Sequence, residues 1–293
     1  MRAANSKLAL RITWLATRAA AAVSPRLAGR VAARLWFTPW RVPPGERGLQ
    51  RQTEWLKETE PVTFSAGRWR IAGFSAGAGP VVVLVHGWGE RGASLGAFVQ
   101  PLVDRGYRVV GIDAPGHGDS SGGQTDGLDI AAAIRSVCDS LGEVHAIVAH
   151  SMAAMTSMFA VREGVPVRAL VLLAPSTRLD HALETFAQMF SLPPNAVTGL
   201  KATIDRRYGA DVWERFSTET MAPSIRVPAL IVHDRDDPQV ALADAEALHA
   251  AWPGSRLTTT EGLGHGRILR DPHVIQTVTS FLEDVSSRAL AGA

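Results

Sequence analysis

The stretch VHAIVAHSMAAM, residues 144–155, decides the fold of this chain. Residues 144–149 are nearly all apolar, which is typical of a strand covered on both faces of a sheet. His150 and Ser151 follow, and small or apolar residues then continue at helical spacing to residue 163. A buried strand that passes directly into a helix is a unit of parallel-sheet proteins. Ser151 is therefore predicted to lie at a sharp strand-to-helix turn.

The same alternation of apolar runs and amphipathic stretches extends over residues 62–285. An opening hairpin is predicted at 62–64 and 68–74, with further strands at 81–85, 107–112, 144–149, 167–173, 227–233 and 256–260. Helices are predicted at 94–105, 128–141, 152–163, 242–252 and 273–285. Such βαβ units build a mostly parallel sheet, and right-handed crossovers place helices on both faces. The predicted fold class is therefore α/β.

Residues 176–224 interrupt this rhythm, since they hold no convincing strand but do hold helical runs at 181–191 and 196–208. We expect them to form a helical cap outside the sheet. The predicted organisation is an N-terminal arm and linker (1–60), a core (61–175 and 225–293) and the cap (176–224). Five apolar residues of the cap could bind an apolar substrate group or form the cap's own core: Leu183, Phe186, Met189, Phe190 and Leu192.

The formal net charge of +2 hides an asymmetry between the arm and the body. Residues 1–45 contain eight Lys and Arg residues and no acid. The whole chain has 30 basic and 28 acidic residues. The residues after 45 therefore contain 22 basic and 28 acidic residues, a net charge of −6. The basic character thus belongs to the arm, and a nucleic-acid partner is not expected.

The arm has apolar residues at helical spacing over 8–35, but Arg11 and Arg18 interrupt them. The apolar stretch is too short and too charged to span a bilayer, and it is a poor secretory signal. Two interpretations stay open: a basic amphipathic helix in peripheral contact with an anionic membrane, or a helix that packs on the body. Trp36, Phe37 and Trp40 favour an aromatic anchor between arm and body.

The single cysteine, Cys138, excludes an intramolecular disulfide and a cysteine-based zinc cluster. We therefore expect a protein of a reducing compartment, the cytoplasm, with any membrane association at the inner face. The chain has no H-E-x-x-H zinc motif and no Walker-type phosphate-binding loop. No metal or organic cofactor is expected.

Polar residues follow four of the predicted strands, where reactive groups of a parallel sheet gather. His86-Gly87-Trp88 follows strand 81–85, and Ser151 follows strand 144–149. An acidic turn with Asp234, Asp236 and Asp237 follows strand 227–233, and a glycine-rich loop with His265 follows strand 256–260. A serine, an acid and a histidine in this order suit nucleophilic catalysis.

The sequence Ala149-His150-Ser151-Met152-Ala153 resembles the G-x-S-x-G nucleophile elbow of the α/β-hydrolase superfamily, with alanine at both glycine positions. The resemblance covers residues 62–285 and is close to bacterial serine hydrolases that carry a helical cap. It implies that Ser151 is the nucleophile, His265 the general base and Asp237 the acid of a catalytic triad. Asp236, or Asp180 after the preceding strand, remain rival acids, and the other two clustered aspartates are expected to form a solvated turn.

The resemblance also implies an oxyanion hole. Its donors are expected to be the backbone N–H groups of Trp88 and of Met152, the residue after the nucleophile. His86 and Gly87 are expected to shape the turn that presents Trp88. A plain glycine turn with a hydrogen-bonded histidine is the simpler alternative for this segment.

The expected activity is hydrolysis of carboxylic esters through an acyl-enzyme, with a small-molecule acyl substrate as the partner. The same triad also serves lactonases, thioesterases, carbon–carbon hydrolases and acyltransferases, and these stay open. A non-catalytic binding or scaffold protein on the same fold is the alternative from another class, because a fold does not imply a function. The two alanines of the elbow are its only support.

Overall fold

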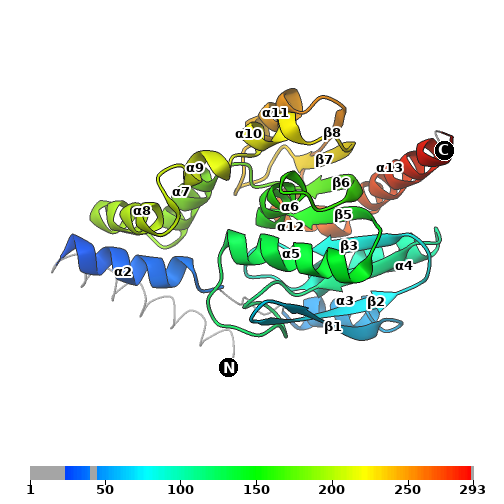
Figure 1. Cartoon of the computed structure of the whole chain (residues 1–293), viewed down its shortest axis with the longest axis horizontal. Coiled ribbons are helices and arrows are strands. Elements are labelled where there is room, and N and C mark those ends of the chain that lie inside the picture. Colours follow the sequence, from blue (N-terminus) through cyan, green and yellow to red (C-terminus); the bar gives the residue numbers. More distant parts are fainter. Residues whose placement is uncertain (1–23, 40–44, 292–293) are drawn as a thin grey trace.

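The computed structural model describes residues 24–39 and 45–291, and their main feature is one eight-stranded sheet (Figure 1). The strand order is β1-β2-β4-β3-β5-β6-β7-β8. The strands are β1 (Glu60–Ala66), β2 (Trp69–Ala76), β3 (Val81–Val85), β4 (Arg108–Ile112), β5 (Val144–His150), β6 (Val167–Leu173), β7 (Ala229–Asp234) and β8 (Ser255–Thr260). β1 and β2 form an antiparallel hairpin, β2 runs antiparallel to β4, and β4, β3 and β5 to β8 are parallel. The predicted α/β class with a mostly parallel sheet is confirmed.

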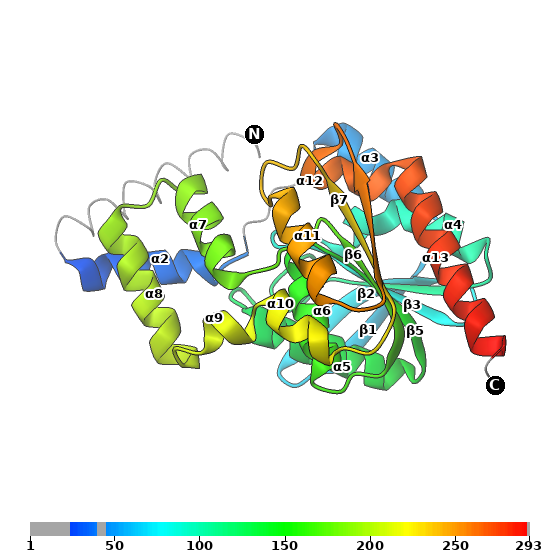
Figure 2. The same cartoon turned by 90° about the horizontal axis from the view of Figure 1, so that it is seen from above.

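Helices cover both faces of the sheet, as Figure 2 shows from above. α5 (Gly127–Leu141), α6 (Met152–Arg162) and α11 (Leu242–Ala251) pack on one face. The 3₁₀ helix η1 (Gly92–Phe98), α4 (Val99–Val103) and α13 (Pro272–Ala291) pack on the other. Within β5, Ile147 and Ala149 belong to the first core, whereas Ala146 and Val148 belong to the second. This division explains why the central strands are uninterrupted apolar runs.

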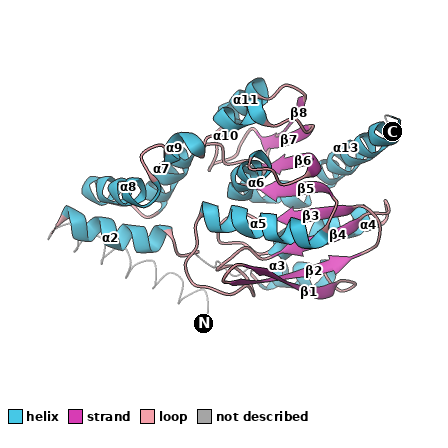
Figure 3. Cartoon of the chain, in the orientation of Figure 1, coloured by secondary structure: helices cyan, strands magenta, loops and turns pink. Residues whose placement is uncertain are grey.

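The segment between β6 and β7 lies outside the sheet and is helical. Its helices are α7 (Leu179–Met189), α8 (Pro194–Tyr208), α9 (Val212–Arg215), α10 (Thr218–Met221) and the 3₁₀ turn η2 (Ala222–Ser224). Figure 3 shows α7, α8 and α9 projecting beyond the strands at one end of the molecule. We refer to residues 176–224 as the insertion.

The N-terminal helix α2 (Pro25–Trp36) packs along α8 of the insertion. The helices cross at two glycines: a Cβ added to Gly29 would lie 2.6 Å from the carbonyl carbon of Gly199. Ala28, Ala32 and Ala33 bury the same face of α2. Part of the arm therefore packs on the body, while Leu8, Ile12, Leu15 and Trp40 lie outside the described residues. The peripheral membrane contact predicted for residues 1–45 stays a prediction.

Two local predictions were wrong. A helix, α3 (Glu46–Trp55), replaces the expected linker; it has no buried residue, so no apolar stripe marked it in the sequence. The helix expected over 94–105 is divided into η1 and α4, and Gly96 of η1 packs against the Trp55 side chain. Over residues 24–39 and 45–291, no helix combines the length and apolar character needed to cross a bilayer.

Candidate active site

Ser151 sits in a strained turn between β5 and α6. Its backbone has φ +55° and ψ −123°. Residues other than glycine rarely adopt a positive φ of this kind. Ala149 and Ala153, two residues away on either side, are fully buried, with 0% of their surface exposed. The Ser151 N–H donates to the carbonyl of Leu173 at 3.0 Å, and its carbonyl accepts from the N–H of Ser176 at 3.1 Å. The end of β6 and the residues directly after it therefore hold the turn.

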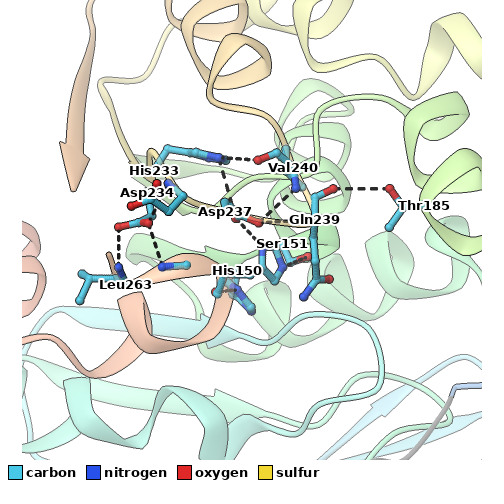
Figure 4. Close-up of polar contacts among 12 residues, drawn as sticks. His150, Ser151, Thr185, His233, Asp234, Asp237, Gln239, Val240 and Leu263 are labelled. Carbon is cyan, nitrogen blue, oxygen red and sulfur yellow. Dashed lines mark hydrogen bonds and ion pairs between the residues drawn. The ribbon is translucent and has the colours of Figure 1, made fainter. Parts of the chain in front are cut away.

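Ser151, His265 and Asp237 form a continuous hydrogen-bonded chain (Figure 4). The distance from Ser151 Oγ to His265 Nε2 is 2.9 Å, and that from His265 Nδ1 to Asp237 Oδ2 is 2.7 Å. A carboxylate can only accept, so Nδ1 carries the proton and Nε2 accepts from the serine hydroxyl. This is the tautomer that a general base next to a serine requires.

Asp237 is held as a carboxylate. Its side chain is fully buried, and burial opposes ionisation. The hydrogen bond from His265 and those from the N–H groups of Gln239 (2.8 Å) and Val240 (3.1 Å) outweigh burial, so the pKa of Asp237 lies below its ordinary value. Of the rival acids, Asp236 instead accepts from the N–H of Gly262, and Asp180 pairs with Arg178. Of these three aspartates, only Asp237 forms a hydrogen bond with the His265 ring.

The expectation that the other clustered aspartates form a solvated turn was wrong for Asp234. Asp234 is fully buried and accepts four hydrogen bonds. The donors are Asp236 N, Thr260 Oγ1, Leu263 N and Gly264 N, at 2.7–3.0 Å. Burial raises the pKa of Asp234, but these bonds outweigh it and lower the pKa overall. The Asp234 carboxylate thus fixes the loop that carries His265. The sequence did not reveal this role, because Asp234 stands there among other acidic residues.

The turn after β3 brings Gly87 and Trp88 next to the nucleophile. A Cβ added to Gly87 would lie 3.0 Å from Ser151 Cβ, so any larger residue would have to displace its neighbours by a few tenths of an ångström. His86 Nδ1 donates to the Gly87 carbonyl at 2.7 Å, and Nε2 accepts from the N–H of Ala114 at 3.0 Å. Burial lowers the pKa of His86, in agreement with a neutral ring that ties two strand ends together.

Trp88 and Met152, the two residues expected to supply the oxyanion donors, line one cavity with Ser151. In residues 24–39 and 45–291, neither backbone N–H donates to a carbonyl in the turns, loops and helix caps. An oxyanion hole acts through preorganised donors, and the assignment of this role to Trp88 and Met152 stays a prediction.

A partly buried ion pair, Glu90–His150, supports this turn and was not predicted. Glu90 Oε2 accepts from Gly87 N at 3.0 Å and from His150 Nδ1 at 2.9 Å, and His150 Nε2 donates to the carbonyl of His265 at 3.1 Å. Because both ring nitrogens face acceptors, His150 is an imidazolium. Burial opposes its charge, but Glu90 outweighs burial and raises the pKa of His150. Although burial works against its charge too, the pKa of Glu90 falls to about 2 because of His150.

A cavity of about 1140 Å³ opens in front of Ser151, between the sheet and the insertion. Of the five apolar insertion residues considered as substrate contacts, Phe186, Met189 and Phe190 line it. Leu183 and Leu192 instead pack in the core. The cavity can therefore accept a sizeable and largely apolar molecule. In the part of the chain that the structure describes, no group of three or more His, Cys, Asp or Glu side chains is arranged to hold a metal ion.

The chain is similar in sequence to enzymes that hydrolyse esters. A pimeloyl-(acyl-carrier protein) methyl ester esterase of Methylococcus capsulatus is 54% identical over 46 residues, which is 16% of this chain and 18% of that protein. An esterase of the same name from Neisseria meningitidis is 27% identical over 256 residues, covering 72% of this chain and 80% of the relative. These similarities support an ester-hydrolysing enzyme at a general level.

Solved structures show the same fold at low sequence identity. A bacterial membrane phospholipase A superposes with a TM-score of 0.62 at 20% identity, covering 82% of this chain and 90% of the other. An esterase from Exiguobacterium antarcticum superposes with a TM-score of 0.59 at 21% identity, covering 76% of this chain and 100% of the esterase. The sequence profile of the alpha/beta hydrolase family matches residues 82–275, which include the serine turn and the His265 loop. This chain belongs to the alpha/beta hydrolase family.

Proposed function

We propose that the chain hydrolyses carboxylic esters through a Ser151-His265-Asp237 triad and an acyl-enzyme intermediate. The observation that carries the proposal is the hydrogen-bonded chain of these three side chains at the wall of a large apolar cavity. Serine, a histidine in the correct tautomer and a buried carboxylate are the groups that this chemistry requires.

In the first half-reaction, Ser151 Oγ attacks the acyl carbon and its proton passes to His265 Nε2. Asp237 orients the ring and stabilises the imidazolium that forms. The tetrahedral intermediate then collapses, the bond to the alkoxy group breaks, and the leaving alcohol takes the proton from His265. In the second half-reaction, His265 removes a proton from water, the resulting hydroxide attacks the acyl carbon, and the acid departs as Ser151 regains its proton.

The negative charge of both tetrahedral intermediates falls on the former carbonyl oxygen. We assign its stabilisation to the N–H groups of Trp88 and Met152, which line the cavity beside Ser151. His86, Gly87 and the carboxylate of Glu90 hold the turn that carries Trp88. Removing one such donor from a comparable site lowers kcat by about 10²–10³.

The insertion serves in this proposal as a cap over the site. It supplies Phe186, Met189 and Phe190 to the cavity, and Thr185 Oγ1 donates to the carbonyl of Gln239 at 3.4 Å, close to Asp237 (Figure 4). The apolar lining favours a small-molecule ester with an apolar acyl or alkyl group. Because two relatives carry a name that specifies a methyl ester, methyl esters belong among the substrates to be tested. We place the enzyme in the cytoplasm on the basis of its single cysteine.

Turnover of p-nitrophenyl acyl esters by the wild type and by Ser151→Ala tests the proposal. We expect turnover by the wild type, loss of at least about 10³-fold in Ser151→Ala, and covalent labelling of Ser151 by a fluorophosphonate. Matched release of acid and alcohol without transfer to an added alcohol distinguishes hydrolysis from acyl transfer. A wild-type protein with neither turnover nor labelling would instead be a binding protein on this fold.

A further inference from the structure

The N-terminal segment, residues 25–39 and 45–55, supplies one wall of the cavity that holds Ser151. Trp36 and Phe37 reach it from the end of α2 and the residue after it, and Glu46, Leu49 and Gln52 reach it from α3. These residues precede the first strand of the sheet and lie far from Ser151 in sequence. The described arm is thus part of the site rather than a separate appendage.

Aromatic contacts fix the end of α2 to the insertion. The Trp36 ring meets the Phe186 ring edge-on, with centroids 5.1 Å apart and planes at 86°. Phe37 lies 6.1 Å from the Tyr208 ring, and the Arg207 guanidinium stacks over Phe37 at 4.6 Å. Phe186 lines the cavity as well, so Trp36 and Phe186 form one continuous aromatic surface.

Separate contacts fix the same segment to the core. The carbonyl of Phe37 accepts from the N–H of Thr125 at 2.8 Å, and Gln124 Nε2 donates to the carbonyl of Arg34 at 3.2 Å. Farther along, Trp55 of α3 packs against Gly96 of η1. Because the segment is attached both to the insertion and to the core, the position of its cavity-lining side chains is fixed relative to Ser151.

Beside the polar Glu46 and Gln52, the cavity face of this segment carries apolar side chains that are incompletely covered. In the described part of the chain, three large hydrophobic side chains are exposed: Leu27, Leu49 and Met189. Leu49 is 53% exposed and Met189 64% exposed, and both line the cavity. Exposed large apolar side chains grouped around a concave site indicate an apolar ligand.

We propose that Trp36 and Leu49 bind the apolar chain of the ester and set its preferred length, which makes the N-terminal segment a specificity element of the enzyme. This inference rests on the proposed ester hydrolysis. Contacts with a chain far from the reacting carbon are made only by substrates long enough to reach them, so these residues raise kcat/KM for long-chain esters and leave short-chain esters unaffected.

The test compares kcat/KM along two series, p-nitrophenyl esters of acids with two to twelve carbons and acetates of alcohols of graded length. We expect Trp36→Ala to lower the ratio of long-chain to short-chain kcat/KM by about tenfold in one series, and Leu49→Ala to lower it by about threefold. Leu27→Ala is the matched control, because Leu27 is exposed on α2 but lies outside the cavity. It should keep the wild-type ratio.

Fluorophosphonate labelling of Ser151 in every variant separates the two proposals. Variants that label normally but keep the wild-type chain-length profile in both series would overturn the specificity role and leave ester hydrolysis standing. Absence of labelling and turnover in the wild type would remove ester hydrolysis itself. If Trp36→Ala does not fold, Leu49→Ala alone tests the specificity role, since the exposed Leu49 side chain is not needed for packing.

Discussion

The Glu90 carboxylate accepts a 2.9 Å hydrogen bond from Nδ1 of His150, the residue directly before Ser151. Through its other contacts, this pair joins the amide of Gly87 to the carbonyl of His265. This partly buried charge pair connects the proposed oxyanion turn, the nucleophile turn and the loop of the proposed general base. It therefore holds three elements of the candidate site in place.

The Glu90–His150 pair gives stability a defined pH dependence. Glu90, with a pKa of about 2 instead of 4.5, stabilises the fold fully above pH 4.5, and its contribution is lost as pH falls through about 2. His150, with a pKa raised above 6.5, contributes fully below pH 6.5, and its contribution is lost as pH rises through the raised pKa. The pair is thus fully effective between pH 4.5 and 6.5.

Glu90→Gln should lower stability most in that window, by about 3 kcal/mol, because His150 loses the partner that keeps it charged. If the neutral ring keeps its N–H on Nε2 for the carbonyl of His265, Nδ1 can only accept, and an amide NH₂ at position 90 that donates to it is set against the N–H of Gly87. Melting temperatures of the wild type and the variant from pH 4 to 10 measure the difference. Glu246→Gln, an exposed site on α11, is the control and should show no such window. A pH-independent difference would contradict the ion pair.

Asp237→Asn should lower kcat/KM by about 10⁴-fold with little change in stability. An amide can present its NH₂ to Nδ1, which favours the tautomer of His265 that cannot accept the serine proton. Asp236→Asn is the matched control, since Asp236 lies one residue away and its carboxylate accepts from the Gly262 amide instead of from His265. It should remain within a few-fold of the wild type. If both variants lost kcat/KM equally, the assignment of Asp237 as the acid would be refuted.

The sheet could be predicted closely from the sequence because the central parallel strands, covered by helices on both faces, are mostly apolar. β3 and β6 begin and end where the sequence predicted. α3 could not be predicted in the same way, since its residues are polar and none is buried. The role of the N-terminal segment in the cavity could not be predicted either, because it depends on contacts between residues as distant as Trp36 and Phe186.

The residues brought together at the site could be predicted because each follows the end of a parallel strand. The order of strands and the resemblance to the elbow motif indicated Ser151 and His265, whereas Asp237 could not be separated from Asp236 by sequence alone. Glu90 and Asp234 could not be predicted, because an acidic residue in a turn is usually solvated and only the folded structure shows which groups surround it. Burial and the number of hydrogen-bond donors around a carboxylate are tertiary properties.

Asp234→Asn should destabilise the protein by about 3 kcal/mol and lower kcat. The two oxygens of Asp234 accept four hydrogen bonds, and replacing one oxygen by NH₂ sets a donor against donors. Urea unfolding at pH 7 measures the loss. Since the pKa of Asp234 is lowered, its contribution is present above pH 3.8 and disappears at lower pH. The wild type and Asp234→Asn should therefore converge in stability on acidification, whereas a constant difference would exclude this carboxylate as the cause.

Gly87→Ala should lower kcat about 10²-fold or more while the fold is retained. The added Cβ would lie 3.0 Å from both His150 Nδ1 and Ser151 Cβ and 3.3 Å from Glu90 Oε2, so either the turn or the nucleophile must move. Gly123→Ala is the control, because no atom lies within 4 Å of the added Cβ at that site. Steady-state kinetics with a p-nitrophenyl ester, together with the rate of fluorophosphonate labelling, measure the effect. Wild-type rates in Gly87→Ala would show that the turn can shift without cost and that Trp88 is not held in place for catalysis.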